Sequence, residues 1–287
     1  GGPLTSPDTQ TNWNGITGRI ELIGYKNAHA ENVMLWCDIH SKTVRVTANI
    51  TGEKNGKAVI SAESFNSEKN HTPAVQSFEY TNGKLDAVYK MGDDCLLWSE
   101  HEPNLYKLRI DIDGDMSEHI IGMREFNTEG GKFTINGEKT FLRGKHDGMI
   151  FPKTAFAPTD LEEWLRVMKI SKSYGMNHYR YHTCCPPESA FIAADMLGIY
   201  MEPQLPFWGT ITEEGEENHN QEEQDFLVEE GFNMLKFFGN HPSYCMMSMG
   251  NELWGSKKIL NDIIGGYKKF DNRHLYTQGS NKFPVVP

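Results

Sequence analysis

The sequence predicts a multi-domain fold of the β plus α/β class: an immunoglobulin-like β-sandwich followed by part of a (β/α)₈ TIM barrel. Two observations lead to this prediction. Apolar residues recur with a period of two up to about residue 125, and from about residue 140 short apolar strands alternate with amphipathic helices. The length of 287 residues leaves room for two or three domains.

The first pattern is typical of half-buried antiparallel strands. Apolar and polar residues alternate over residues 44–50 and again over residues 106–112. Asn82-Gly83 separates two further strand-like runs and predicts a hairpin. Short strands without a long helix predict a β-sandwich over residues 29–126.

The segment ahead of this sandwich, residues 1–28, is rich in turn formers. We expect one strand in it, over residues 19–23. We interpret the whole segment as the tail of a preceding domain.

The second pattern predicts about five β/α units over residues 127–287. Strands are expected at residues 141–143, 178–182, 199–204, 244–249 and 274–278. The first helix is expected to begin at a capping box, residues 159–162 (TDLE), and to end near Gly175. The second should run from Pro187 to Gly198.

Two more helices complete this pattern. The third is expected to end at Gly239, with an apolar face formed by Phe226, Leu227, Met234 and Phe237. The fourth carries one apolar side, formed by Ile259, Leu260, Ile263 and Ile264.

Composition excludes some partners. The chain has 28 Lys and Arg against 39 Asp and Glu, a net charge of −11, and no basic cluster that would predict nucleic-acid binding. Its apolar runs are far shorter than the ~20 residues of a membrane span. The five cysteines are odd in number and predict no disulfide framework. We therefore expect neither a nucleic-acid nor a membrane partner.

The clearest local signal is residues 249–254 (MGNELW), at the carboxyl end of the fourth expected barrel strand. In a β/α barrel that end is the active-site face. We expect apolar strands and Trp254 to desolvate the Glu252 carboxyl group, which favours its protonated form and suits a general acid. Asn251 offers an amide to a substrate hydroxyl. The alternative is a loop glutamate that caps the next helix.

Other expected strands also end in ionisable or aromatic residues. Arg180 and His182 are two apart on one strand, so they point the same way, and we expect them to bind hydroxyls or orient a carboxylate. The alternative is a buried arginine paired with an acid. We expect further substrate-binding side chains at Arg143, His146, Asp147, Glu202, Trp208 and Trp254. The two tryptophans offer aromatic faces to a sugar ring, or serve in ordinary packing.

Ligand spacing does not predict a metal site. His178, His182, Cys184 and Cys185 crowd one segment, but adjacent cysteines lack the spacing of a structural zinc site. The sequence also has no nucleophile elbow, P-loop or dinucleotide fingerprint. We expect no metal and no cofactor.

Taken together, these motifs resemble glycoside hydrolase family 2, which contains β-galactosidases, β-glucuronidases and β-mannosidases. Residues 14–22 resemble the end of that family's N-terminal sugar-binding jelly roll, and 98–106 and 122–124 (GMR) resemble the end of its immunoglobulin-like domain. The barrel segments of the family are similar to residues 133–144, 175–182 (GMNHYRYH), 240–243 (NHPS) and 248–252 (SMGNE).

The resemblance implies a retaining β-glycosidase that acts on terminal β-linked sugars and is β-galactosidase-like. It implies that Glu252 is the general acid/base, that Asn251 contacts the sugar 2-hydroxyl, and that Arg180 and His182 line the subsite of the non-reducing sugar. The family's nucleophile is a glutamate at the end of the seventh barrel strand. The resemblance therefore implies a chain cut at both ends, without its nucleophile and inactive alone.

Departures from the family pattern bear on the metal and on the sugar. Residues 203–208 (PQLPFW) cannot supply the magnesium ligands that some bacterial members place after the third strand. The spacing between Arg180 and His182 and the short first-strand loop leave the sugar open, with galactose expected. A periplasmic or secreted location follows from the resemblance alone.

Two other functions stay open at this point. The absent second carboxylate favours a non-catalytic carbohydrate-binding or interaction protein. A metal-dependent hydrolase would use His178, His182 and Glu202. A five-strand portion of a barrel would also leave open strand edges, which predicts self-association through that face.

Overall fold

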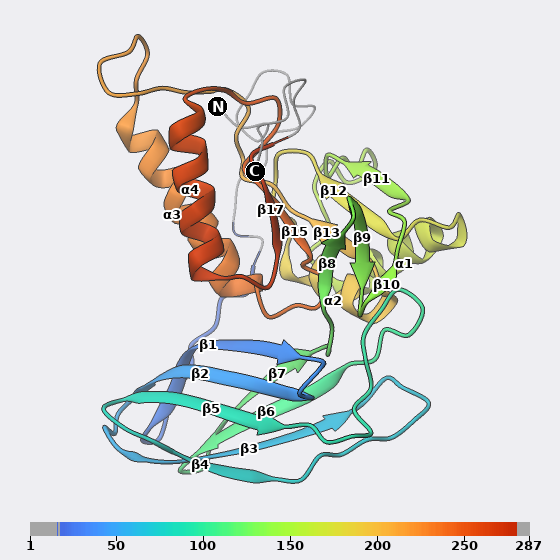
Figure 1. Ribbon diagram of the computed structural model, residues 1–287, viewed down its shortest axis with the longest axis vertical. Coiled ribbons are helices and arrows are strands. Elements are labelled where there is room, and N and C mark those ends of the chain that lie inside the picture. The colour runs from blue at the N-terminus through green and yellow to red at the C-terminus, as the bar shows by residue number, and fades with distance from the viewer. Residues whose placement is uncertain (1–15, 17, 280–287) are drawn as a thin grey trace.

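The computed structural model describes residues 16 and 18–279 and has two parts (Figure 1). The predicted jelly-roll tail lies largely outside the described residues. The expected strand at 19–23 does not form: this stretch is irregular, and Ile20 and Leu22 are exposed. A single strand without a neighbour has no partner for its backbone groups and no surface to cover its apolar side chains.

The sandwich consists of two antiparallel sheets. One has the order β1-β2-β5 and the other the order β4-β3-β6-β7. The strands are β1 (His29–Asp38), β2 (Thr43–Thr51), β3 (Gly56–Ser64), β4 (Gln76–Tyr80), β5 (Lys84–Lys90), β6 (Tyr106–Ile112) and β7 (Asp115–Ile121). The alternation seen in the sequence buries every second residue of β2 and β6 in the core between the sheets.

The expected hairpin at Asn82-Gly83 is only partly correct. Both residues have positive φ, as a type I′ turn requires. A single bridge between Thr81 and Lys84 closes the turn, after which β4 pairs with β3 and β5 pairs with β2. The turn therefore passes the chain from one sheet to the other.

A small antiparallel sheet, which the sequence analysis did not predict, follows the sandwich. It contains β8 (Phe126–Glu129), β9 (Lys132–Ile135) and β10 (Glu138–Lys139). Gly130 and Gly131 form its first turn, both with positive φ. A Gly-Gly pair between short runs is a hairpin signal, and it was available in the sequence.

The upper part contains a row of five parallel strands among the described residues. These are β11 (Gly144–Asp147), β12 (His178–Tyr181), β13 (Tyr200–Glu202), β15 (Met246–Ser248) and β17 (Leu275–Thr277). Bridges at Met201–Tyr244 and Gln204–Ser248 join β13 to β15. Four strands form where expected, although shorter, and the alternation of strand and helix is confirmed.

The first of these strands was placed wrongly, because residues 141–143 are irregular and β11 begins at Gly144. The Asn177 side chain takes the backbone groups there: its Oδ1 accepts from Arg143 N at 2.7 Å, and its Nδ2 donates to Phe141 O at 3.1 Å. With those groups bound to a side chain, the strand ladder starts only beyond them.

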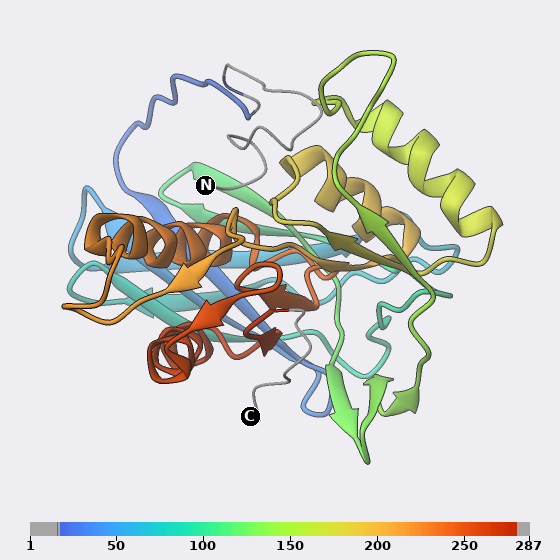
Figure 2. The ribbon, with the colours of Figure 1, turned by 90° about the horizontal axis from the view of Figure 1, so that it is seen from above.

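Four helices flank this row of strands (Figures 1 and 2). They are α1 (Leu161–Ser173), α2 (Glu188–Leu197), α3 (Gln221–Phe238) and α4 (Lys257–Phe270). The expected second helix is confirmed, with Pro187 as N-cap and Gly198 as a left-handed C-cap. No helix in the described part of the chain is long and apolar enough to cross a membrane.

Two helix details differ from the expectation. The N-cap of α1 is Asp160 and not Thr159, because Asp160 Oδ1 accepts from Glu163 N at 2.9 Å. On α3, Leu227 and Met234 are buried as expected, but Phe226 and Phe237 are exposed. A helix turns by about 100° per residue, so neighbours of a buried position point away from the core.

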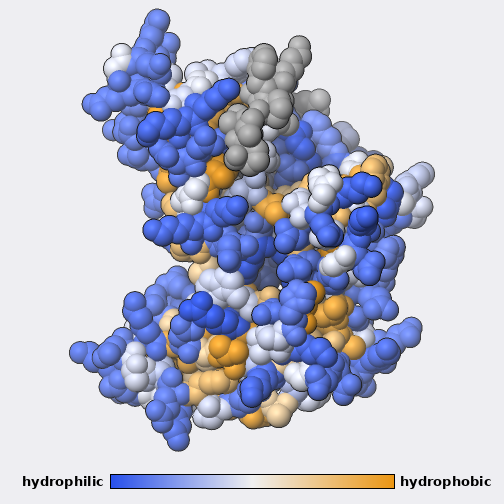
Figure 3. Space-filling model, viewed as in Figure 1, coloured by the Kyte–Doolittle hydropathy of each residue, from blue (hydrophilic) through white to orange (hydrophobic). Residues whose placement is uncertain are grey.

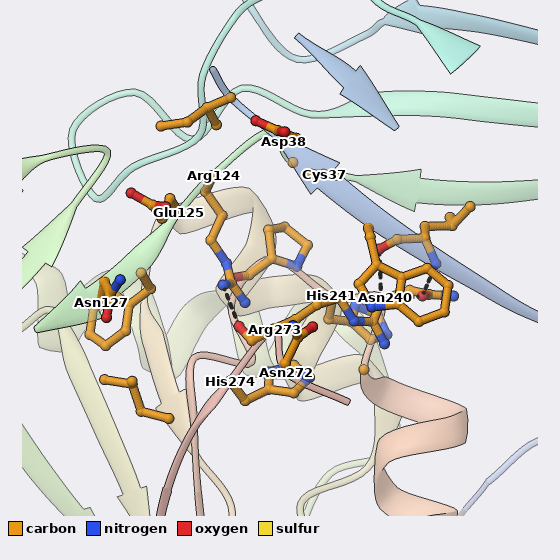
Figure 4. A pocket seen from close by; sticks show the side chains of 18 of the residues that line it. Cys37, Asp38, Arg124, Glu125, Asn127, Asn240, His241, Asn272, Arg273 and His274 are labelled. Carbon is orange, nitrogen blue, oxygen red and sulfur yellow. Dashed lines mark hydrogen bonds between the residues drawn. The ribbon is translucent and has the colours of Figure 1, made fainter. Parts of the chain in front are cut away.

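Two arginines join the sandwich to the strands above it. Arg124, which follows β7, donates to the backbone carbonyls of Pro242, Tyr244 and Arg273 at 2.7–3.0 Å. Arg273 in turn donates to the carbonyl of Leu35 in β1 at 2.8 Å. Figure 4 shows both guanidinium groups in a pocket of about 430 Å³ between the two parts.

This pocket lies at the amino ends of the barrel strands, where residues 240–242 precede β15 and residues 272–274 precede β17. The surface is indented between the two parts (Figure 3). The arginine donors in the pocket already have backbone and carboxylate partners. The pocket is therefore a joint between domains, at the opposite end of the strands from Glu252.

Candidate active site

The alternation of side chains along β12 directs Arg180 into the row of strands. Tyr179 and Tyr181 are fully buried in the core that also contains Trp164 and Met168 of α1. Since successive residues of a strand point to opposite faces, Arg180 and His182 point away from the helices. The strand thus presents them on the inner face, as the sequence predicts.

Arg180 connects three strand ends through hydrogen bonds. Its Nη2 donates to Asn251 Oδ1, which follows β15, at 2.7 Å. Gln204, which follows β13, is fully buried beside it. With the amide oxygen of Gln204 facing the guanidinium group, that oxygen accepts from Nε at 2.8 Å and from Nη2 at 3.0 Å, and the amide nitrogen donates to Tyr181 O at 3.2 Å.

The loops after β13 and β15 run side by side. They form a short parallel pair, β14 (Thr210–Ile211) with β16 (Trp254–Gly255). Four backbone hydrogen bonds join the two loops. Leu205 N donates to Ser248 O, Asn251 N to Phe207 O, Trp254 N to Gly209 O, and Ser256 N to Ile211 O. The backbone at Asn251 and Glu252 is therefore held against the loop of the neighbouring strand.

Glu252 lies in a strained backbone segment. Its φ is +48°, in the left-handed region that residues other than glycine seldom adopt. Gly250 just before it has φ +149°, and a Cβ atom there would lie 2.1 Å from Phe207 O. The Glu252 side chain is exposed, so the desolvation by apolar strands that we expected is not found among the described residues.

Histidine and tryptophan rings line the same end of the strands. The His182 ring lies 4.8 Å from that of His146 and 5.4 Å from the edge-on ring of Trp208, centroid to centroid. Burial and the nearby His146 and Arg180 lower the pKa of His182, and the charge of Glu252 acts against them. The residues predicted at three strand ends thus come together here.

Glu202 of β13 pairs in register with Arg180 of β12, but its side chain turns toward His178, two residues before Arg180. Its Oε2 is 3.6 Å from His178 Nε2, and both side chains are largely buried. His178 Nδ1 is 2.9 Å from Tyr200 O. The His178–Glu202 pair sits below Arg180, so Glu202 contributes to the wall under the site.

Arg143 and Asp147 are not brought to this group. Arg143 precedes β11 and binds Glu100 Oε2 at 2.8 Å, near the joint with the sandwich. Asp147 lies on the helix-facing side, where it is 3.0 Å from Lys145 Nζ and accepts from Met149 N at 2.7 Å. Both were expected at the active-site face, but strand register directs them elsewhere.

Trp254 lies at the rim of the site, and the histidines that the structure describes do not gather into a metal site. Trp254 is 54% exposed and belongs to β16, beside the loop that carries Trp208. Among residues 16 and 18–279, no three His, Cys, Asp or Glu side chains come together as a metal site. The donor set His178, His182 and Glu202 is divided between the deeper pair and the ring cluster.

Gln204 is the contact that the sequence analysis missed. In the sequence it belongs to the stretch without magnesium ligands, although it is the last residue of the strand expected at 199–204. Every other residue of this cluster was found by its position at a strand end, and the same criterion would have selected Gln204.

Comparisons with known proteins give a consistent result. The family described as "Glycosyl hydrolases family 2" matches residues 28–124, and its TIM barrel domain matches residues 126–284. The chain is 24% identical to a β-galactosidase large subunit of Lactobacillus acidophilus over 92% of its own length and 44% of that protein. It is 25% identical to a β-galactosidase of Bifidobacterium adolescentis, over 93% and 27%.

A solved structure agrees with the fold. The β-glucuronidase of Parabacteroides merdae matches 88% of this chain and 33% of that chain, with a TM-score of 0.70 and 18% identity. The chain thus spans less than half the length of the relatives it matches.

Proposed function

This chain belongs to glycosyl hydrolase family 2, and from that membership we propose that it carries the acid/base half of the active site of a retaining β-glycosidase. The observation that carries the proposal is the place of Asn251 and Glu252 at the carboxyl end of β15, with Arg180 bound to Asn251 at 2.7 Å. Relatives named as β-galactosidases support a β-galactoside as the first substrate.

Glu252 has two tasks in the proposed mechanism. As an acid it donates a proton to the glycosidic oxygen while the bond from that oxygen to the anomeric carbon breaks. As a base it then takes a proton from the water that releases the sugar from the enzyme. Exposure of Glu252 at the strand end suits both tasks, because the leaving group and the water must reach it.

The remaining residues of the cluster would hold the sugar. Asn251 offers its amide to the hydroxyl beside the reacting carbon. Arg180, His146 and His182 supply donors on the inner face, and Trp208 and Trp254 supply exposed aromatic surface at the rim. Arg143 and Asp147 have no part in the proposed sugar site, because Arg143 binds Glu100 and Asp147 lies beside Lys145 on the helix-facing side.

The nucleophile is proposed to lie outside the described residues. A retaining enzyme needs a second carboxylate about 5–5.5 Å from the acid/base. Glu202 is held beside His178 below Arg180. The chain covers 44% and 27% of the two named β-galactosidases, so a carboxylate from another part of the protein is the one to seek.

The test uses Glu252→Gln in the full-length protein with two β-galactosides that differ only in leaving group. With phenyl, which needs protonation, we expect kcat/KM to fall by about 10²–10⁴-fold. With 2,4-dinitrophenyl, which leaves without a proton, the loss should be much smaller. Glu214→Gln, in the exposed loop before α3, is the matched control and should change neither rate.

Equal losses on both substrates would contradict the acid role of Glu252. Cleavage of β-glucuronides in place of β-galactosides would keep the mechanism and change the sugar. Binding of glycosides by the wild type without any cleavage would overturn the proposal and leave a carbohydrate-binding protein.

A further inference from the structure

We infer that Gln204 is a positioning residue of this site, which holds Arg180 and through it fixes the orientation of the Asn251 amide. The inference rests on the proposed function. It concerns a residue that touches no substrate and acts through two others.

Gln204 is itself held on every side. Its side chain is fully buried, and its amide uses both ends: the oxygen binds Nε and Nη2 of Arg180, and the nitrogen binds Tyr181 O. Its backbone N donates to Cys184 O at 3.1 Å, and its backbone bridges to Ser248 in β15. A buried amide with both ends satisfied has one favoured orientation.

The two hydrogen bonds to Gln204 fix the position of the Arg180 guanidinium group. One oxygen accepts from Nε and from one hydrogen of Nη2. The second hydrogen of Nη2 is then directed to Asn251 Oδ1 at 2.7 Å. A hydrogen-bonded chain therefore runs from the end of β13 through β12 to the loop after β15.

This chain of bonds sets the polarity of the Asn251 amide. With Oδ1 accepting from Arg180, the Nδ2 donor must point away from Arg180, at the opposite edge of the planar amide group. Asn251 N is also fixed to Phe207 O at 3.1 Å, so the backbone cannot rotate to compensate. A donor held in advance at a sugar hydroxyl aids the reaction most when it needs no reorganisation.

The experiment is a double-mutant cycle in the full-length protein, with Gln204→Leu, Asn251→Ala and the pair. Leucine removes the acceptor for Arg180, and we expect kcat/KM to fall about 10- to 100-fold. In the Asn251→Ala background the same change should cost less than about threefold. Gln204→Glu keeps an acceptor for both arginine donors and should recover most of the loss.

Gln224→Leu is the matched control. Gln224 is also a buried glutamine that binds backbone only, donating to Thr212 O at 2.7 Å from α3. It should leave kcat/KM within about twofold at 25 °C even if stability falls. A loss like that of Gln204→Leu would show that burial alone explains the effect.

Crystal structures of wild type and Gln204→Leu test the positioning without any activity. We expect the guanidinium group to move by about 1 Å or more and the 2.7 Å contact to Asn251 to lengthen. An unmoved Arg180, or additive losses in the cycle, would overturn the inference. A wild type without glycosidase activity would overturn the proposed function instead, while the crystal structures still decide whether Gln204 holds Arg180.

Discussion

The two ends of the barrel strands are built differently. At the amino ends, Arg124 and Arg273 donate to backbone carbonyls, and Arg273 also donates to the fully buried Asp271. At the carboxyl ends, Glu252 is exposed with a left-handed backbone, and Trp208 is 48% exposed. The arginines of the amino end lie inside the joint and bind protein groups, whereas the side chains of Glu252 and Trp208 at the carboxyl end are exposed, where a ligand can reach them.

The difference shows why similar motifs need separate interpretation. Residues 122–124 and 240–243 carry the family resemblance as clearly as residues 248–252, yet they form the joint under the barrel. Position along a strand, and not the chemistry of the side chain, separates a structural arginine from one at the candidate active site. In β/α barrels the amino end serves stability and the carboxyl end serves catalysis.

The largest expected effect on stability is that of Asp271→Asn, at the amino ends of the strands. Burial alone would raise the pKa of Asp271, but the charges of His274 and Arg273, with their hydrogen bonds, hold that pKa well below its ordinary value. Arg273 Nη2 is 2.5 Å and His274 Nε2 is 3.2 Å from Asp271 Oδ2. Removing the charge leaves the largely buried Arg273 guanidinium group without its carboxylate, so we expect a loss of about 3–5 kcal/mol in unfolding free energy at pH 7.

The pH dependence of this loss has a definite sign. Because the Asp271 pKa is lowered in the folded state, its carboxylate contributes its full stability above the unfolded pKa of about 3.9. The contribution declines progressively as the pH falls from that value towards the much lower folded pKa. In urea denaturation between pH 7 and pH 3, the difference in unfolding free energy between wild type and Asp271→Asn should therefore become smaller as the pH falls. Asp262→Asn, which breaks an exposed pair with Lys258, is the control with little change. A difference in unfolding free energy between wild type and Asp271→Asn that stays constant with pH would contradict the lowered pKa of Asp271.

A second, smaller effect is expected on the carboxyl end, with Gly250→Ala. The added Cβ would meet Phe207 O at 2.1 Å, and φ +149° is unfavourable for alanine. We expect a loss of at least about 1–3 kcal/mol in unfolding free energy. Because relief of the clash separates the two loops, kcat should fall as Asn251 and Glu252 shift.

Gly265→Ala in α4 is the control for that substitution. Nothing lies within 4 Å of its added Cβ, so alanine should stabilise the helix by about 0.5–1 kcal/mol. Urea denaturation and kcat on one glycoside would measure both variants. Full activity in Gly250→Ala would show that the loop pair does not position Glu252.

The sequence predicted four of the five strands in the parallel row, all four helices and the cluster at the strand ends. These depend on local periodicity, on capping residues and on the rule that parallel strands end at one face. It could not predict that Arg143 and Asp147 turn elsewhere, since that depends on strand register and on the distant Asn177 and Glu100. The contact of Gln204 with Arg180 joins residues 24 apart and emerges only from the folded sheet.

The smallest expected effect on stability is that of Trp208→Ala, which tests whether this exposed side chain serves binding or packing. The indole is 48% exposed and meets the His182 ring edge-on at 5.4 Å, so its loss leaves no cavity in the core. We expect stability to change by less than about 0.5 kcal/mol and KM to rise a few-fold, worth about 0.5–1.5 kcal/mol of aromatic contact with the sugar. Tyr174→Ala, an aromatic 80% exposed after α1, should change neither quantity. A large loss of stability in Trp208→Ala would mean that the rim of the site is built like the joint, and that the two ends of the strands differ less than their exposed groups indicate.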